Sequence, residues 1–209
     1  MTTRGRFIAL EGGEGAGKST QARLLAEALR ERGLEVVTTR EPGGTAGAEA
    51  IRGLLLGLDG DGWNPRAEAL LFAAARSDHV ERLIVPAVTR GAWVICDRFV
   101  DSSRAYQGGG GGLSDEEVME LHRIGSQGLL PDLTLLIEVR PEVAEGRLSA
   151  RDGDVSDRIG GRPAEFHARV AAAFARFAAE QPERFALIDG NGDAETIHRA
   201  ILSAIEPLT

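Results

Sequence analysis

The chain has 209 residues and a mass of 22.2 kDa, the size of one ordinary domain with a substantial core. Apolar residues make up 43% and charged residues 27% of it, which is typical of a globular protein and not of a disordered one. The single Cys96 excludes an internal disulfide and a cysteine-based zinc site, and the net charge of −8 argues against a general nucleic-acid binder.

The composition also bounds the compartment and the ligands. No apolar run approaches the length needed to cross a membrane, and Arg4 and Arg6 lead straight into a predicted strand instead of a signal peptide. We therefore expect a cytoplasmic protein with a small-molecule substrate, and neither nucleic acid nor a membrane as a partner. Because the net charge is negative, an anionic ligand must be captured by locally clustered arginines.

Short apolar runs and amphipathic helical patterns alternate along the chain, with no linker and no repeat between them. In chain order, the predicted elements are a strand over 6–10, a helix over 18–32, a strand over 35–39, helices over 46–56 and 66–90, a strand over 93–96, a helix from about 114, a strand over 133–139, helices over 141–151 and 164–179, a strand over 185–188 and a last helix ending near 205. Five strands separated by helices predict a single α/β domain over 1–209, in which a five-stranded parallel sheet carries helices on both faces. Ligands of such folds bind at the carboxyl ends of the strands.

Local signals mark several boundaries. Gly33 follows the first helical pattern as a C-terminal stop, and Pro86 is expected to kink the long helix that contains it. Ser114 and Glu117 form a capping box at the start of the helix that follows. The stretch 97–108 is interpreted as a strand end followed by a loop that terminates in glycine.

The chain contains one lysine, Lys18, while the other 23 of its 24 basic residues are arginine. This lysine falls in Gly12–Ser19, which matches the pattern G-x-x-x-x-G-K-[ST] between a predicted strand and a predicted helix. There, backbone N–H groups converge on phosphate oxygens, Lys18 reaches the β- and γ-phosphates, and Ser19 joins a Mg²⁺ shell. The pattern indicates a purine triphosphate with Mg²⁺; a fortuitous lysine in a Gly-rich turn is the competing interpretation. The residues expected to bind the nucleotide are Gly12, Gly13, Glu14, Gly15, Ala16, Gly17, Lys18, Ser19 and Thr20.

The phosphate loop alone does not separate kinases, GTPase switches and motors. A GTPase would need a guanine-specifying Asn-Lys-x-Asp segment, and the two asparagines of the sequence, Asn64 and Asn191, stand beside no lysine. A motor or a large ATPase is normally longer. A small-molecule kinase fits the length best, because it needs only a phosphate loop, an acceptor pocket and a closing lid.

A second informative stretch runs from Asp97 to Gly108. It offers an acid and an arginine, followed by hydroxyls, an aromatic ring and an amide, which can hold a Mg²⁺-bound water, a phosphate and a base or sugar. With this stretch, the sequence strongly resembles the thymidylate kinases over nearly its whole length. The matching segments are 11–20, 39–45, 71–76 and 97–110, in the right order and at the right spacing.

The resemblance implies transfer of the γ-phosphate of ATP to dTMP, giving dTDP for dTTP biosynthesis, with Mg²⁺ as the metal. It also implies the nucleoside-monophosphate-kinase form of the P-loop fold, usually as a homodimer, and a tight turn at Glu41–Pro42 whose peptide bond can be cis. The implied dTMP-binding residues are Arg40, Glu41, Phe72, Arg76, Arg98, Ser103, Tyr106 and Gln107.

The resemblance gives each of these side chains a role. Phe72 would stack on the thymine ring and Arg76 would hydrogen-bond a ring carbonyl. Arg98 would grip the acceptor phosphate, with Arg40 near it. Ser103 and Gln107 would line the base pocket. Tyr106 would pack against the sugar and disfavour ribose. Taken singly, each except Arg98 is more often an ordinary core or surface residue, and only their joint spacing favours a site.

The expected acceptor is a phosphate oxygen that is already ionised near neutral pH, so the reaction needs no general base. Catalysis should rest on positioning and on cations that follow the phosphoryl group. Glu11 sits where the family carries an acid that orients the acceptor or a metal-bound water, and Asp97 would hold Mg²⁺ through water beside Ser19. The implied catalytic residues are Glu11, Lys18, Arg98, Arg151 and Arg158.

The resemblance places the last two arginines in a lid over about 147–163. Glu14 stands where some relatives carry an arginine, which resembles the bacterial type that supplies this arginine from the lid. Arg151 and Arg158 are the preferred candidates. Arg147 is a third, for which an ordinary helix-surface arginine is a serious competing interpretation.

Two other functions stay open. Another nucleotide kinase or a deoxynucleoside kinase is possible, and a kinase that acts on a hydroxyl would need a carboxylate base, for which Glu11 could serve. A non-catalytic nucleotide-binding regulator would use the lid to signal to a partner. The four histidines have no metal-ligand spacing and are assigned no role: His79, His122, His167 and His198.

Overall fold

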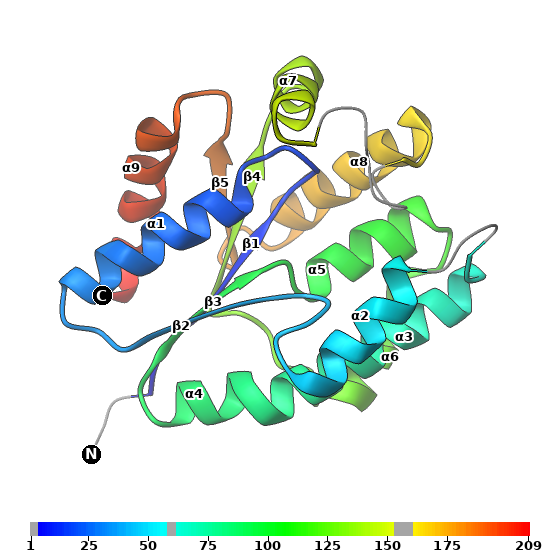
Figure 1. Cartoon of the computed structure of the whole chain (residues 1–209), viewed down its shortest axis with the longest axis horizontal. Helices are drawn as coiled ribbons and strands as arrows, with labels where there is room; N and C mark the ends of the chain where they lie inside the picture. The colour runs from blue at the N-terminus through cyan, green and yellow to red at the C-terminus, as the bar shows by residue number, and fades with distance from the viewer. Residues whose placement is uncertain (1–3, 58–61, 153–160) are drawn as a thin grey trace.

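A computed structural model describes residues 4–57, 62–152 and 161–209 of the chain, with the side chains of 151 and 152 left out. Its centre is a parallel β-sheet with the strand order β2-β3-β1-β4-β5 (Figure 1). The strands are β1 (Phe7–Glu11), β2 (Val36–Arg40), β3 (Trp93–Asp97), β4 (Leu133–Glu138) and β5 (Phe185–Asp189). The predicted five-stranded parallel sheet is confirmed, and each end of each strand lies within one residue of its predicted position.

Helices cover both faces of this sheet (Figure 1). The helices are α1 (Lys18–Glu31), α2 (Ala46–Leu56), α3 (Pro65–His79), η1 (Val80–Ile84), α4 (Val85–Thr89), α5 (Val100–Ser103), η2 (Arg104–Gly110), α6 (Asp115–Ser126), α7 (Pro141–Asp152), α8 (Ala164–Glu180), α9 (Ala194–Ile205) and η3 (Glu206–Leu208). Helices α1 and α9 pack together on one face, while η1, α4 and α8 pack on the other. Of the helices in the described part of the chain, none combines the length and the apolarity that crossing a membrane requires.

The strands send alternate side chains into two cores, one on each face of the sheet. Ile8 and Leu10 of β1 lie in the core beside α1 and α9, whereas Phe7 and Ala9 lie in the opposite core. All five residues of β1 are buried, as expected for the central strand of a covered parallel sheet. The loop that follows β1 therefore starts from the fully buried central strand of the sheet.

Several predicted boundaries are confirmed. Ser114 Oγ accepts a hydrogen bond from the N–H of Glu117 (3.1 Å) and the Glu117 carboxylate accepts one from the N–H of Ser114 (2.9 Å), which completes the capping box. Gly33 ends α1 with φ +81°, and the Glu41–Pro42 peptide is cis. The long predicted helix is interrupted as expected, because the π-helical turn η1 precedes Pro86 at the start of α4.

In the stretch 97–108, the predicted strand end at Asp97 is confirmed, but the predicted loop is wrong, because the short helix α5 and the π-helix η2 cover 100–110. The glycines at the end of this segment allow close packing. An added Cβ at Gly109 would lie 2.7 Å from the Cβ of Ala173, and one at Gly110 would lie 2.5 Å from the ring of Phe166. The backbone of η2 therefore packs directly against α8 at positions where only glycine fits. These glycines form a packing surface and not a turn.

Candidate active site

Two adjoining cavities open at the carboxyl ends of β1 and β3, where ligands bind in parallel α/β sheets. The first has a volume of about 280 Å³ and the second about 620 Å³. Four residues line both cavities and form the wall between them: Glu14, Ser19, Asp97 and Arg98. A group bound in one cavity would therefore meet a group bound in the other across this shared wall.

The loop between β1 and α1 supplies one side of the second cavity, which its residues Gly15, Gly17 and Lys18 line. Glycine is required at two positions, because an added Cβ at Gly12 would lie 2.4 Å from a backbone oxygen of β4 and one at Gly15 would lie 2.6 Å from a backbone oxygen of α7. The N-terminus of α1 follows directly, and its partial positive charge suits an anion at this place.

Lys18 is buried at the start of α1, and its ammonium donates hydrogen bonds to the backbone oxygens of Gly12 (3.1 Å) and Gly13 (2.6 Å). The pKa of Lys18 is lowered to about 8, mainly by burial and secondly by the nearby positive charge of Arg98. The loop thus holds a buried ammonium beside the second cavity, where an anionic ligand would stabilise its charged form.

Arg98 follows β3 and reaches into the shared wall with a backbone φ of +70°, which is uncommon for a residue other than glycine. Its guanidinium pairs with Glu14 at 2.5 Å and donates to Gly12 O at 3.2 Å and Ser102 Oγ at 3.1 Å. The ring of Tyr106 lies 5.0 Å below the guanidinium. Glu14, expected only with the nucleotide-binding residues, therefore also faces the first cavity through this ion pair.

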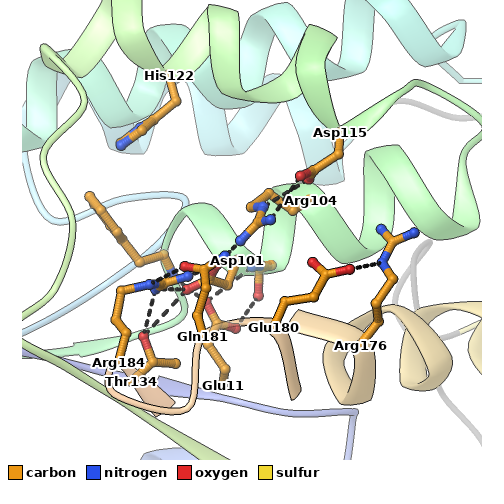
Figure 2. A network of polar contacts seen from close by, with 12 residues as sticks. Glu11, Asp101, Arg104, Asp115, His122, Thr134, Arg176, Glu180, Gln181 and Arg184 are labelled. Carbon is orange, nitrogen blue, oxygen red and sulfur yellow. Dashed lines mark hydrogen bonds and ion pairs between the residues drawn. The ribbon is translucent and has the colours of Figure 1, made fainter. Parts of the chain in front are cut away.

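Glu11 is completely buried and lies outside the described lining of both cavities. Its carboxylate accepts hydrogen bonds from the N–H groups of Phe99 (2.8 Å) and Ser102 (3.0 Å) and from Ser102 Oγ (2.6 Å). Burial raises the pKa of Glu11 to about 7, with a further upward contribution from the negative charge of Asp101 (Figure 2). Glu11 thus holds the start of α5 next to Arg98.

Replacing Glu11 with glutamine is expected to remove one source of pH-dependent stability. Because the pKa of Glu11 is about 7 in the fold against an ordinary 4.5, the folded state holds a proton that the unfolded state has lost between these values. The free energy of unfolding of the wild type therefore falls as pH rises through this window, by at most about 3 kcal/mol from this group. Urea unfolding near pH 5 and near pH 8 should show the Glu11→Gln protein gaining stability relative to the wild type at the higher pH. A difference that stays constant with pH would contradict this account.

The far end of the first cavity carries an arginine and an amide beside an aromatic ring: Phe72, Arg76 and Gln107 line it together. Arg76 Nε donates to Glu41 Oε2 at 2.7 Å, and its Nη2 donates to Ser103 Oγ at 2.8 Å. Nη1 makes no hydrogen bond to any described residue, so it remains a donor for a ligand. The predicted base-pocket residues are thus brought together.

A buried chain of polar contacts fixes this arginine. His79 Nδ1 lies 3.0 Å from Glu41 Oε1, and His79 Nε2 lies 2.7 Å from Thr39 Oγ1. Since a carboxylate only accepts hydrogen bonds, the geometry assigns the proton to Nδ1 of His79. His79 was given no role from the sequence, although its position three residues after Arg76 on one helical face was a usable signal.

Arg40 and Tyr106 complete the first cavity. Arg40 is 57% exposed in its side chain and pairs weakly with Glu49 at 3.3 Å, so it sits at the mouth. Tyr106 is buried against Phe166 and Phe174 of α8 with its hydroxyl toward Arg98.

Ser19 and Asp97 meet in the shared wall, where Ser19 Oγ donates to Asp97 Oδ2 at 2.6 Å. A hydroxyl and a carboxylate are the oxygen ligands that Mg²⁺ prefers, and Mg²⁺ completes its shell with water and substrate phosphates. No group of three or more His, Cys, Asp or Glu in the described ranges could hold a metal ion alone. The donor set fits a magnesium ion brought in with a nucleotide, and the pairing predicted from sequence is present.

The predicted lid arginines are only partly placed. Arg158 lies outside the described residues, and Arg151 is described only as part of the backbone of α7. Arg147 lines the second cavity, where its Nη2 donates to the backbone oxygens of Gly190 (2.9 Å) and Gly192 (3.0 Å). Arg147 is thus half-buried and held by the turn between β5 and α9, a contact that the sequence did not indicate.

A buried ionic network anchors α5 and η2, which carry Ser102, Ser103, Tyr106 and Gln107 (Figure 2). Asp101, fully buried, accepts hydrogen bonds from Arg104 (3.0 Å) and from both Nη atoms of Arg184 (2.6 and 2.9 Å). Arg184 also donates to Thr134 Oγ1 of β4 at 3.2 Å, and Arg104 pairs with Asp115 of α6 at 2.7 Å. The helix pair α5–η2 is thereby tied to β4, to the turn between α8 and β5, and to α6.

Known proteins with the same features supply the comparison. A family model described as thymidylate kinase matches residues 10–201. The thymidylate kinase of Rhizorhabdus wittichii is 56% identical over 204 residues, covering 98% of both chains. That of Bradyrhizobium sp. strain ORS 278 is 47% identical over 203 residues, covering 97% of this chain and 90% of the other. The crystal structure of thymidylate kinase from Ehrlichia chaffeensis matches with a TM-score of 0.78 at 32% identity, covering 97% of this chain and 99% of that one.

Proposed function

The chain belongs to the thymidylate kinase family, and we propose that its two cavities hold dTMP and ATP on opposite sides of their shared wall. As a thymidylate kinase it phosphorylates dTMP in nucleotide biosynthesis, with a nucleotide as the phosphate donor. The observation that carries the assignment of the cavities is the wall itself. It places the phosphate loop, the Ser19–Asp97 pair and Arg98 between two cavities, where a phosphoryl group would pass from donor to acceptor.

ATP is assigned to the second cavity. Its triphosphate would lie along Gly12–Thr20 with Lys18 as the ammonium partner, and its base would lie toward Arg147 and the turn before α9. Mg²⁺ would be held by Ser19 directly and by Asp97 through water, and when bound it would neutralise charge on the phosphates.

dTMP is assigned to the first cavity. Arg98 would bind its phosphate, with Arg40 at the mouth, and Phe72 would stack on the ring. Arg76 Nη1 would donate to a ring carbonyl. The other lining residues would contact the base and the sugar: Glu41, Ser103, Tyr106 and Gln107.

This arrangement needs no group that removes a proton from the acceptor, because a phosphate monoester is ionised at neutral pH. Catalysis would come from alignment across the wall and from the cations Lys18 and Arg98. We retain Arg151 and Arg158 as arginines of a lid over about 147–163, within one kinase domain spanning 1–209. Glu11 acts in this scheme by holding α5 and hence Arg98.

A panel of acceptors tests the assignment of the first cavity. ADP release should be fastest with dTMP, weaker with dUMP, and near background with UMP, dCMP, AMP and thymidine. Loss of the contact with the 5-methyl group accounts for roughly 1–3 kcal/mol, so dUMP should be used with a kcat/KM lower by about one to two orders of magnitude. Equal efficiency with dUMP and dTMP would contradict the thymine pocket.

The same panel separates the alternative functions. Turnover with thymidine alone would indicate a nucleoside kinase with Glu11 as a base, which the burial of Glu11 disfavours. Absence of turnover with any acceptor would indicate a nucleotide-binding regulator.

The remaining assignments are a homodimer and a cytoplasmic location. Leu70 of α3 is 56% exposed and Ile124 of α6 is 67% exposed, and the two helices are in contact. Figure 1 shows α3 and α6 side by side. Exposed apolar side chains on adjacent helices are typical of a surface that a second copy covers. Light scattering should give about twice the mass of 22.2 kDa. The buried free thiol of Cys96 suits a reducing compartment.

A further inference from the structure

We propose that Glu68 of α3 is a specificity-determining positioning residue: it fixes the orientation of the Gln107 amide, so that Gln107 presents only an acceptor to the base of the nucleotide. This inference rests on the proposed placement of dTMP in the first cavity. Glu68 lines neither cavity in the described residues and carries no motif in the sequence, so it would act only through Gln107.

Glu68 is 4% exposed and touches the pocket side chain through one oxygen. Gln107 Nε2 donates to Glu68 Oε1 at 3.0 Å, and Arg162 Nη2 donates to Glu68 Oε2 at 2.6 Å. The guanidinium of Arg162 is itself held 4.5 Å over the ring of Phe166. Both oxygens of the carboxylate are thus engaged, and its position is set from two sides.

The chemistry of the pair decides which end of the Gln107 amide faces the cavity. Paired with the guanidinium of Arg162, the carboxylate of Glu68 only accepts hydrogen bonds, and only the NH₂ group of an amide donates. The nitrogen of Gln107 must therefore face Glu68, and its carbonyl oxygen must face the other way. Among the described residues none donates to Gln107 Oε1, while Gln107 lines the first cavity.

Gln107 Oε1 and Arg76 Nη1 then form an acceptor and a donor in one pocket. This pair complements a pyrimidine edge with an oxygen at position 4 and an N–H at position 3, which thymine and uracil possess. Cytosine has the opposite pattern, an amino group at position 4 and an acceptor at N3. A site built for the first pattern leaves buried polar groups unpaired with the second, and such mismatches discriminate strongly.

The test compares dTMP with 5-methyl-dCMP, which keeps the methyl group and differs only along this edge. In the Glu68→Gln protein, the new amide offers both a donor and an acceptor, so the Gln107 amide can turn over and donate to N3 of the cytosine ring. The ratio of kcat/KM for dTMP to that for 5-methyl-dCMP should fall by about tenfold or more. Arg76 still opposes the amino group, so the preference for dTMP should shrink without reversing.

Two further variants serve as controls for this test. Glu120→Gln removes the same charge from an exposed position on α6 that pairs only with Arg123 among described residues, and it should leave the ratio unchanged. The double variant Glu68→Gln with Gln107→Glu places a carboxylate at 107, which accepts hydrogen bonds in either rotation, and it should restore the preference for dTMP. If Glu68→Gln alone does not fold, the double variant decides the question. A preference for dTMP like that of the wild type supports the inference, and loss of that preference overturns it.

Failure of this inference is distinguishable from failure of the pocket assignment. Gln107→Leu should raise the KM for dTMP if the base lies in the first cavity; an unchanged KM would overturn the pocket itself. A raised KM in Gln107→Leu together with an unchanged ratio in Glu68→Gln would overturn only the role of Glu68. A purely structural role would lower turnover of both nucleotides in proportion.

Discussion

Replacing Lys18 with alanine is expected to lower kcat by about two to three orders of magnitude or more, as removal of a preorganised charge from a transition state does elsewhere. The ammonium lies at the base of the second cavity on the loop that ends β1, whereas the base-binding side chains line the first cavity. The dissociation constant of dTMP should therefore stay close to that of the wild type. Steady-state kinetics with calorimetric titration of dTMP measures both quantities, and full activity of Lys18→Ala would refute the assignment of the loop.

Two properties of this lysine sharpen the experiment. Lys18→Arg keeps the charge but puts a planar guanidinium into a space formed by backbone oxygens of Gly12 and Gly13, so it should be nearly as inactive as Lys18→Ala. Because the sequence has a single lysine, an amine-specific reagent can modify only Lys18 and the chain's terminal amine. ATP should protect Lys18 from modification, as read by mass spectrometry, and dTMP alone should not.

Local sequence patterns predicted the scaffold well because the relevant forces are local. Strand bounds followed from apolar runs such as 93–96, the start of α6 followed from Ser114 and Glu117, and the phosphate loop followed from its glycines and lysine. In each case, the residues that decide the structure lie within a few positions of one another.

The parts that escaped prediction depend on partners far away in the chain. The loop predicted within 97–108 is instead helical, because the glycines at 109 and 110 pack against α8 and because the carboxylate that accepts from its first N–H groups is Glu11 of β1. The contacts of Glu68 with Gln107 and of His79 with Glu41 span 39 and 38 residues. Only the fold brings these side chains together.

The fold also explains why charged groups are buried around a site for polyanions. Asp101 forms buried ion pairs with Arg104 and Arg184 (Figure 2), and Glu41 forms one with Arg76. These pairs hold the acceptor-side helices in one geometry. Removing one member of such a pair is strongly destabilising, whereas the pair itself adds little stability. Their value lies in fixing donors before the ligand arrives, which is the condition for electrostatic catalysis.

Replacing Arg98 with alanine is expected to lower kcat/KM for dTMP by about three orders of magnitude, because charge-assisted hydrogen bonds are lost and Glu14 loses the counter-charge of Arg98. In the wild type, Glu14 at 2.5 Å is neutralised by Arg98. Without the guanidinium, the Glu14 carboxylate loses the counter-charge of Arg98 in the cavity assigned to the acceptor. The double variant Arg98→Ala with Glu14→Gln should therefore recover about tenfold in kcat/KM relative to Arg98→Ala.

Arg40 provides the matched comparison for this effect, because it lines the same cavity but is 57% exposed and pairs with Glu49 outside the wall. Arg40→Ala should lower kcat/KM for dTMP by about tenfold at most, since solvent screens its charge. Arg98→Lys should recover little, because one ammonium cannot reach Gly12 O, Ser102 and a phosphate from the same backbone position. If Arg40→Ala and Arg98→Ala lowered kcat/KM for dTMP equally, the placement of Arg98 between the two cavities would be contradicted. A kcat/KM of the double variant no higher than that of Arg98→Ala would contradict it as well.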